Sequence, residues 1–339
     1  MRSLLVLLLC LPFLKGQAQA PTRVFDFEMP ERKVANSFYN KIILIDARPD
    51  TTHLGVIQKG AFNTQTKLIS RNGLRRDFEK LLGGLTDASA GNGTLVFQLR
   101  KLRFSEITEA MSETGKCRFR ANVYALEGEK YHLLTSIDTI LVVEAFDVTK
   151  KMQRHGGQLI SGFLAEALTQ APQGNIVLQA AQLAKIDSIE KSAFAVYNIP
   201  VLKDGIYKTF ASFRDQTPEY GVIANVKDGR LKSFRVDNGK KKGPAMQTRP
   251  YAIVADGTAY IINSYGNYPV TREDGNLYYT GRLQSNGNTR EMVAAGVMFG
   301  LIGTAIVSAN SNSKFNLMVD HLNGEPIRLK SEEPAATKR

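Results

Sequence analysis

Apolar and polar residues follow two different periods in the first half of the chain. Apolar residues at helical spacing predict amphipathic helices over 68–85 and 152–168. Short β-branched runs or alternation with a period of two predict strands at 41–46, 94–103, 116–126 and 130–143. The order strand, helix, three strands, helix is typical of a mixed sheet covered by helices.

The second half is dominated by short alternating segments and turn signals. Asp-Gly pairs at 228–229 and 256–257, and Asn323-Gly324, are typical of tight hairpin turns. Strands are expected at 221–226, 230–236, 251–254, 259–262, 276–283, 315–320 and 326–329. The last two strands are too small to be stable alone, so they should join the sheet formed by residues 220–283.

These patterns predict an α+β protein with an N-terminal mixed sheet and two helices, followed by an antiparallel β-rich domain with a Gly-rich apolar helix. The break at Pro172–Asn175 separates the two halves. The expected divisions are a signal peptide at 1–20, an α/β domain at 21–175, a connector at 176–200, a β-rich domain at 201–330 and a polar tail at 331–339.

The first twenty residues have the organisation of a secretory signal peptide. Arg2 precedes the apolar run 4–14, and Ala18 and Ala20 supply the small residues before a cleavage site. A buried helix or a membrane anchor is the alternative, but the run is short for a membrane span. Cys10 lies within the apolar run, so it is not expected to be lipidated. The chain is therefore predicted to be exported to the periplasm, the outer membrane or the outside.

The charge of the chain favours anionic partners. The formal net charge is +12, and loss of Arg2 and Lys15 with the signal peptide leaves 12 − 2 = +10. Such a surface attracts acidic lipids and glycans. No nucleic-acid-binding module accompanies the charges, so no nucleic acid is expected. The basic clusters are Arg71/Arg75/Arg76, Arg100/Lys101/Arg103 and Lys240-Lys241-Lys242, the last in a turn-like stretch.

No pattern of catalytic, cofactor-binding or metal-binding residues is recognisable, and none is predicted. Zinc sites need three or four convergent ligands, whereas His53, His132, His155 and His321 are scattered. A nucleophile elbow and a phosphate-binding loop are missing from the sequence. After cleavage Cys117 is the one remaining cysteine; a core role is favoured over a reactive thiol beside Arg118 and Arg120.

Two sets of residues admit a second interpretation. Asp46, Asp138 and Asp147 fall at expected strand ends, where a capping or turn role is favoured over acid chemistry. Gly205-Ile206-Tyr207 and Tyr220-Gly221 suggest a GIY-YIG nuclease, but the required helix with Arg and Glu does not follow. Tyr207, Phe210 and Phe213 are instead expected to form an aromatic core stripe at helical spacing.

The most unusual segment is 292–309, which carries eighteen residues without a charge. Gly296, Gly300 and Gly303 recur on one face of a helix, beside Phe299, and such small residues permit close helix packing. These four residues are the candidate packing or interface site. A helix packed in the fold is favoured, and a membrane-associated segment or a full span are the alternatives.

The layout of the first half resembles small envelope lipoproteins that assist transporters or lipopolysaccharide assembly. It covers the strand ending in Asp46, the Leu-rich helix, the long hairpin and the closing helix, without a lipid-bearing Cys. The second half resembles exported Bacteroidetes-type proteins of unknown function. This likeness rests on the pattern GIYxTFxxF at 205–213 and DGxxYIIN at 256–263. It implies a shared fold and supplies no chemistry.

The sequence favours a non-catalytic binding or assembly module of the cell envelope. The expected partners are an envelope protein or an anionic lipid or glycan, with association at the membrane surface. A hydrolase-like enzyme acting on an envelope glycan or lipid is the first alternative. A secreted ligand-binding protein is the second.

Overall fold

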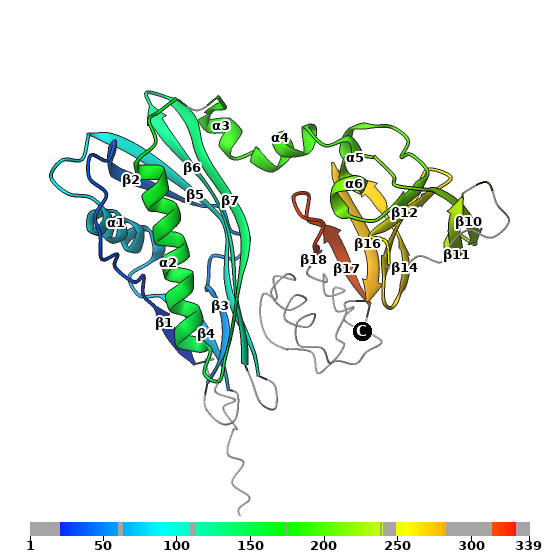
Figure 1. Ribbon diagram of the computed structural model, residues 1–339, viewed down its shortest axis with the longest axis horizontal. Coiled ribbons are helices and arrows are strands. Elements are labelled where there is room, and N and C mark those ends of the chain that lie inside the picture. The colour runs from blue at the N-terminus through cyan, green and yellow to red at the C-terminus, as the bar shows by residue number, and fades with distance from the viewer. Residues whose placement is uncertain are drawn as a thin grey trace, which may run out of the picture.

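The computed structural model describes residues 21–59, 64–108, 113–173, 175–237, 239, 249–282 and 314–329 (Figure 1). The α+β class is confirmed, because helices and strands both contribute to it. The expected signal peptide and the segment 292–309, with Gly296, Phe299, Gly300 and Gly303, lie outside the described residues. Among the helices of the described ranges, none is both long and apolar enough to cross a membrane.

An eight-stranded mixed sheet forms the N-terminal unit, with α1 and α2 on one of its faces (Figure 1). Its order is β1-β4-β3-β5-β6-β7-β8, and β2 pairs with β5. The pairs β1–β4, β2–β5 and β3–β5 are parallel, and the others are antiparallel. The bounds are β1 Thr22–Phe25, β2 Tyr39–Asp46, β3 Gly55–Lys59, β4 Thr64–Ser70, α1 Leu74–Leu85, β5 Gly93–Thr108, β6 Glu113–Glu127, β7 Lys130–Ala145, α2 Thr149–Leu168 and β8 Val177–Gln179.

The start of the first helix differs from the sequence expectation. Residues 68–70 belong to β4, and α1 begins at Leu74. Gly73 separates the two elements with a φ of 86°, a left-handed conformation that glycine adopts without strain. Leu68 is buried against the same core as α1, and this explains why its position fitted a helical pattern. The strands β1 and β3 were also not expected, because their sequences are short and mixed.

The apolar face of the large sheet holds the N-terminal core. Phe97 and Phe119 on neighbouring strands pack against Phe163 of α2, with ring centroids 6.1 and 5.7 Å away. At Gly156, α2 comes so close that a Cβ atom would lie 2.5 Å from the Phe104 ring. Alternation then places the intervening residues of β5 and β6 on the opposite face.

Three short helices connect the large sheet to the C-terminal unit, which contains the smaller sheets. The helices are α3 Ala180–Leu183, α4 Ile186–Ser192 and α5 Ala195–Asn198. The C-terminal elements are β9 Gly205–Tyr207, α6 Phe210–Arg214, β10 Gly221–Lys227, β11 Arg230–Asp237, β12 Ala252–Ala255, β13 Thr258–Asn263, β14 Gly266–Pro269, β15 Thr271–Glu273, β16 Asn276–Arg282, β17 Lys314–Val319 and β18 Pro326–Arg328. They form the sheets β10-β11, β14-β13-β12-β9 and β15-β16-β17-β18.

The last hairpin joins the preceding strands as the sequence predicts. β17 pairs antiparallel with β16, and β18 pairs with β17. The aromatic stripe is a core feature, because Tyr207 and Phe213 are fully buried. The prediction that Tyr207 shares a helix with Phe210 and Phe213 was wrong, because Tyr207 ends strand β9. The turn at residue 208 changes the period before α6 begins at Phe210.

The two units do not share a hydrophobic core among the described residues. One cluster lies within the large sheet and its helices, and another packs Leu183 and Ile186 against that sheet. The remaining two clusters lie in the C-terminal unit, with Val196 of α5 in one of them. Contacts between the units therefore depend on polar side chains and on the connecting helices.

Candidate functional site

A cleft of about 990 Å³ lies between the polar face of the large sheet and the C-terminal unit. It is lined by strand β5 with Arg120 of β6, by the end of β2 and the loop 47–53, by the helices α3 and α4, and by the hairpin β17–β18 with Asn276 of β16. In Figure 1 this hairpin faces the large sheet, and α3 and α4 bridge the two units. The volume of this cleft is at the upper end of the range for small-molecule binding sites. Such sites also form preferentially where domains meet.

Basic residues of the neighbouring strands β5 and β6 lie together on one face of the sheet, and Lys101, Arg103 and Arg120 among them line the cleft. We call Lys101, Arg103, Arg118 and Arg120 the basic stripe. Lys101 is paired with Arg120 and Arg103 with Arg118 in the register of β5 and β6, so all four side chains share one face. A bulge between Leu99 and Lys101 also turns Arg100 toward the cleft. Local strand geometry thus concentrates the charges.

The C-terminal unit places carboxylates on this stripe. We call residues 320–325, between β17 and β18, the acidic turn. Arg120 Nη2 donates to both oxygens of Asp320, at 2.9 and 3.0 Å. The same nitrogen donates to Asp138 Oδ2 of β7 at 2.8 Å. Arg118 Nη2 lies 2.8 Å from the other Asp138 oxygen and 3.5 Å from Glu325 Oε2.

Backbone geometry holds the acidic turn in shape. The Asp320 amide donates to the Glu325 carbonyl, and the Gly324 amide donates to the Asp320 carbonyl, both at 2.8 Å. Gly324 has a φ of 75°, and a Cβ atom there would lie 2.3 Å from Phe210. The Tyr251 hydroxyl also donates to the Gly324 carbonyl at 2.8 Å. The turn is therefore fixed to the C-terminal core independently of its contacts with the stripe.

A second charged cluster fixes helix α4 beside the cleft. Arg100 donates to both oxygens of Glu190, at 2.6 and 2.7 Å, and to Asp187 at 2.6 Å. His321 Nε2 lies 2.7 Å from Glu190 Oε2. Arg100 thus connects the sheet to α4, and His321 connects α4 to the acidic turn.

Asp187, Glu190 and His321 are close enough to hold a metal ion, with one ligand atom of each within 4.8 Å of the others. Two of these ligands are carboxylates that already bind the Arg100 guanidinium. A divalent cation would have to displace or approach a buried positive charge, which is electrostatically unfavourable. The donor set therefore fits an arginine-centred ion-pair network better than a metal centre.

The ion pairs keep the buried Asp320 and the half-buried Glu190 charged. Burial alone would raise the pKa of Asp320, but Arg120 and Lys101 outweigh burial and lower it to about 2. Burial likewise opposes charge on Glu190, but bonds with His321 and Arg100 lower its pKa to about 2. Burial raises the pKa of Glu325, and the attraction of Arg118 does not compensate.

Cationic residues outnumber acidic residues in the lining of the cleft, and Asp46, Glu190 and Asp138 behind the lining pair with three of the cations. Its lining contains eight Arg and Lys residues and three Asp residues. Burial lowers the pKa of Lys101, and repulsion from Arg120 and Arg118 contributes in the same direction. The cationic lining is Arg48, Arg100, Lys101, Arg103, Arg120, Lys185, Lys191 and Arg328. An anion entering the cleft would relieve repulsion among these groups.

The structure revises several interpretations of the sequence. Lys101 and Arg103 of the Arg100/Lys101/Arg103 cluster pair with Arg120 and Arg118 across the two strands, a relation that the sequence does not indicate. Cys117 is a fully buried core residue, and burial raises the pKa of its thiol. The capping role for Asp138 was wrong, because it lies within β7 and pairs with both arginines.

The acidic partners of the stripe were not found from the sequence. Asp320 and Glu325 flank an Asn-Gly turn signal, where carboxylates are common for local reasons. Glu190 and His321 lie 131 positions apart. The only local signal was the alternation of β6, which places Arg118 and Arg120 on the face opposite Cys117 and Phe119, together with Lys116 and Asn122.

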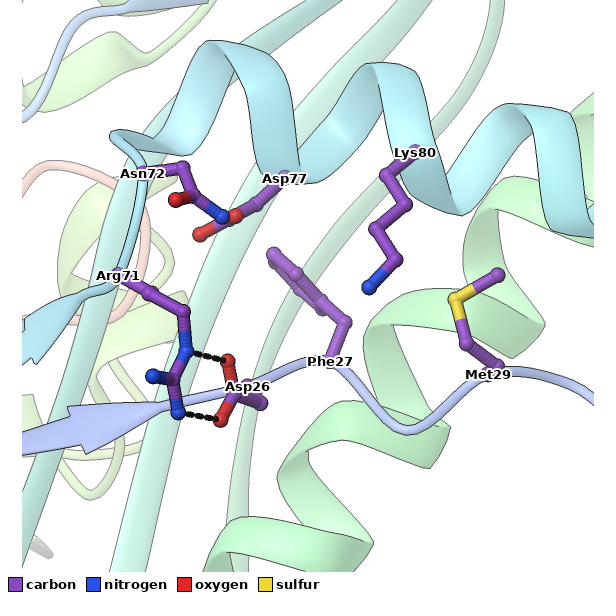
Figure 2. A pocket seen from close by; sticks show the side chains of 7 residues that line it. All are labelled: Asp26, Phe27, Met29, Arg71, Asn72, Asp77 and Lys80. Carbon is purple, nitrogen blue, oxygen red and sulfur yellow. Dashed lines mark hydrogen bonds and ion pairs between the residues drawn. The ribbon is translucent and has the colours of Figure 1, made fainter.

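A smaller pocket of about 240 Å³ lies on the other side of the large sheet, between α1 and the chain after β1 (Figure 2). Arg71 and Asp26 face each other there through two hydrogen bonds, at 3.1 and 2.9 Å. Both side chains are 59 % exposed, so their interaction contributes little to stability. Arg71 is thus paired locally, and Arg75 and Arg76 lie exposed on α1.

Comparison of the chain with protein-family models, with curated proteins and with solved structures gives no match.

Proposed function

We propose that this chain is an exported binding or assembly module of the cell envelope, and that the cleft between its units holds an anionic partner. The observation that carries the proposal is the eight-to-three excess of cationic over acidic residues in the cleft lining. Charged clefts with low-dielectric walls concentrate ligands of opposite charge.

The electrostatics of the cleft favour binding over catalysis. An effective general acid has a pKa near the operating pH. The pKa values of Asp320 and Glu190 are about 2, so both remain ionised at neutral pH and cannot donate a proton. Arginine contacts also occupy their oxygens. These carboxylates are suited to fixing the walls of a site.

Isothermal titration of the purified protein with poly-L-glutamate, polygalacturonate and phosphatidylglycerol vesicles tests the binding proposal. The test variant is Lys185→Gln/Arg328→Gln, which removes two charges from the cleft lining. Lys227→Gln/Arg230→Gln on the exposed β10–β11 hairpin is the matched control. We expect at least one anion to bind, with about tenfold or greater loss in the cleft variant only.

Two results would contradict the binding proposal. One is that no anionic probe binds the wild-type protein or any variant. The other is that both double variants bind as tightly as wild type, which would place anion binding outside the cleft.

Export is tested by separating cell compartments and sequencing the N-terminus of the recovered protein. Cleavage after Ala20 gives a chain that begins at or near Pro21. An intact Met1 terminus in the cytoplasmic fraction would contradict export.

A further inference from the structure

The acidic turn contacts the basic stripe as a bound ligand would, although it belongs to the same chain. Asp320 binds Arg120, Glu325 lies beside Arg118, and Asn323 Nδ2 donates to Asp138 at 3.3 Å. These contacts join a peptide turn to a preformed basic surface. Their chemistry, two carboxylates on two arginines, is that of acidic-motif recognition.

The contact between Glu325 and Arg118 has poor hydrogen-bond geometry. Glu325 Oε2 and Arg118 Nη2 are buried 3.5 Å apart, and Glu325 Oε2 has no hydrogen-bond partner, whereas Arg118 Nη2 lies 2.8 Å from Asp138 Oδ1. A buried charged group without hydrogen bonds is costly. Burial accordingly raises the pKa of Glu325 despite the nearby guanidinium. The Glu325 carboxylate is therefore held more weakly than that of Asp320, and a carboxylate that bonds Arg118 at a shorter distance would compete with it.

The contact between the large sheet and the last hairpin is polar. None of the hydrophobic clusters among the described residues spans the large sheet and the β17–β18 hairpin. Polar contacts between domains resemble transient interfaces, and relative motion is the default expectation for them. Release of the turn would break ion pairs without opening an apolar core.

We propose that the basic stripe is the docking site for an acidic peptide segment of a partner protein, and that the acidic turn is an internal competitor for this site. The proposal rests on the proposed function and names the partner class and its regulation. The partner binds only those molecules in which the turn has left the stripe. Because these are a small fraction of the total, the apparent affinity for the partner is lower than the affinity of the free stripe in proportion to that fraction.

The geometry defines the partner further. Arg118 and Arg120 are two positions apart on one strand face, which separates their Cα atoms by about 7 Å. A fitting segment presents two carboxylates at about this spacing, as Asp or Glu residues do at alternate positions of an extended chain. A peptide is favoured over a glycan or a lipid because the stripe already binds a peptide turn. The side-chain amide of Asn323 in this turn also donates to Asp138.

The test uses a tryptophan reporter and a synthetic peptide. The chain contains no Trp, so Leu322→Trp introduces a unique fluorophore into the acidic turn. The probe is a peptide copying residues 318–327, and its control carries Asn and Gln in place of Asp320 and Glu325. In the reporter background, Asp320→Asn/Glu325→Gln weakens the internal competitor. Glu273→Gln/Asp274→Asn, on exposed positions of the same unit, is the matched control.

We expect the acidic peptide to bind the Asp320→Asn/Glu325→Gln protein at least about tenfold more tightly than the reporter protein or the matched control. In the reporter protein, saturating acidic peptide should shift the indole emission to the red as the turn enters water, and the neutral peptide should not. Arg118→Gln/Arg120→Gln, checked for folding by circular dichroism, should abolish the peptide signal.

Equal peptide affinity in all three proteins, with no change in emission, would overturn the proposal. The proposal would also be overturned if the Asp320→Asn/Glu325→Gln protein bound polygalacturonate or phosphatidylglycerol vesicles more tightly than the reporter protein does, with no gain in affinity for the acidic peptide. The partner would then not be a peptide. If anions still bind in a manner sensitive to Lys185 and Arg328, the proposed function stands without the internal competitor. If no anion binds any variant, the proposed function fails as well.

Discussion

Arg120 and Asp320 are 200 positions apart in the chain, and one nitrogen of the arginine donates to both carboxylate oxygens. Asp320 is 2 % exposed and Arg120 is 7 % exposed, so this pair is protected from solvent and salt. It joins the large sheet directly to the last hairpin. Removing one partner of such a pair costs more than the pair itself contributes, because the other charge stays buried.

Asp320→Asn should therefore weaken docking of the two units. Arg120 keeps its bond to Asp138, so we expect a loss of about 1–3 kcal/mol instead of the larger cost of an isolated buried charge. Small-angle scattering should report a larger radius of gyration. Glu273→Gln is the control, and equal dimensions for both variants would show that the pair does not hold the units together.

Docking of the units should also depend on acidity. The pKa values of Asp320 and Glu190 in the folded protein are about 2, below the value of about 4 for unfolded carboxyls. Their contribution is thus complete above pH 4 and is lost as the pH falls toward 2. Glu325 has a raised pKa, so its protonation acts in the opposite direction.

Scattering between pH 7 and pH 2 tests this dependence. The dimensions should be constant from pH 7 to pH 5 and should increase below pH 4. The Asp320→Asn protein should show a smaller change over the acidic range. A transition centred near pH 6 would contradict the assignment to these carboxyls.

The packing of α2 gives a prediction about the stability of the N-terminal unit. At Gly156 a side chain would enter the Phe104 ring and approach Cys117 Sγ at 3.3 Å, whereas Gly162 has no neighbour within 4 Å. Gly156→Val should destabilise by about 1–3 kcal/mol through overpacking. Gly162→Ala should stabilise by about 0.5–1 kcal/mol through helix propensity. Thermal melting checks both, and equal melting temperatures would contradict the close approach.

The glycines of segment 292–309 remain a sequence-based prediction. If Gly296, Gly300 and Gly303 pack against a neighbouring backbone within the fold, Gly300→Leu should lower the melting temperature of the detergent-free protein, at a cost of about 1–3 kcal/mol. Unchanged melting with lost oligomers or lost flotation on liposomes would identify an interface instead. A variant that matches wild type in all three measurements would show that this glycine face has no packing role.

Local periodicity was sufficient to predict much of the sheet and both long helices. The alternation through Cys117 and Phe119 indicated which side of β6 is apolar, and the same alternation puts Arg118 and Arg120 on the other side. The turn at Asn323-Gly324 was also predictable, because it depends on a left-handed glycine and on the residues beside it. Side-chain direction along a strand is a short-range property.

Only the tertiary structure decided which charged residues meet. The parallel pairing of β1 with β4, the contact of Glu190 with His321 and the docking of Asp320 on Arg120 all join positions far apart in the chain. Asp138 shows the same limit, because its position along the chain suggested a cap until β7 placed it beside two arginines. A carboxylate at a turn has the same local pattern whether it faces water or a buried guanidinium, since its environment is set by the packing of distant strands.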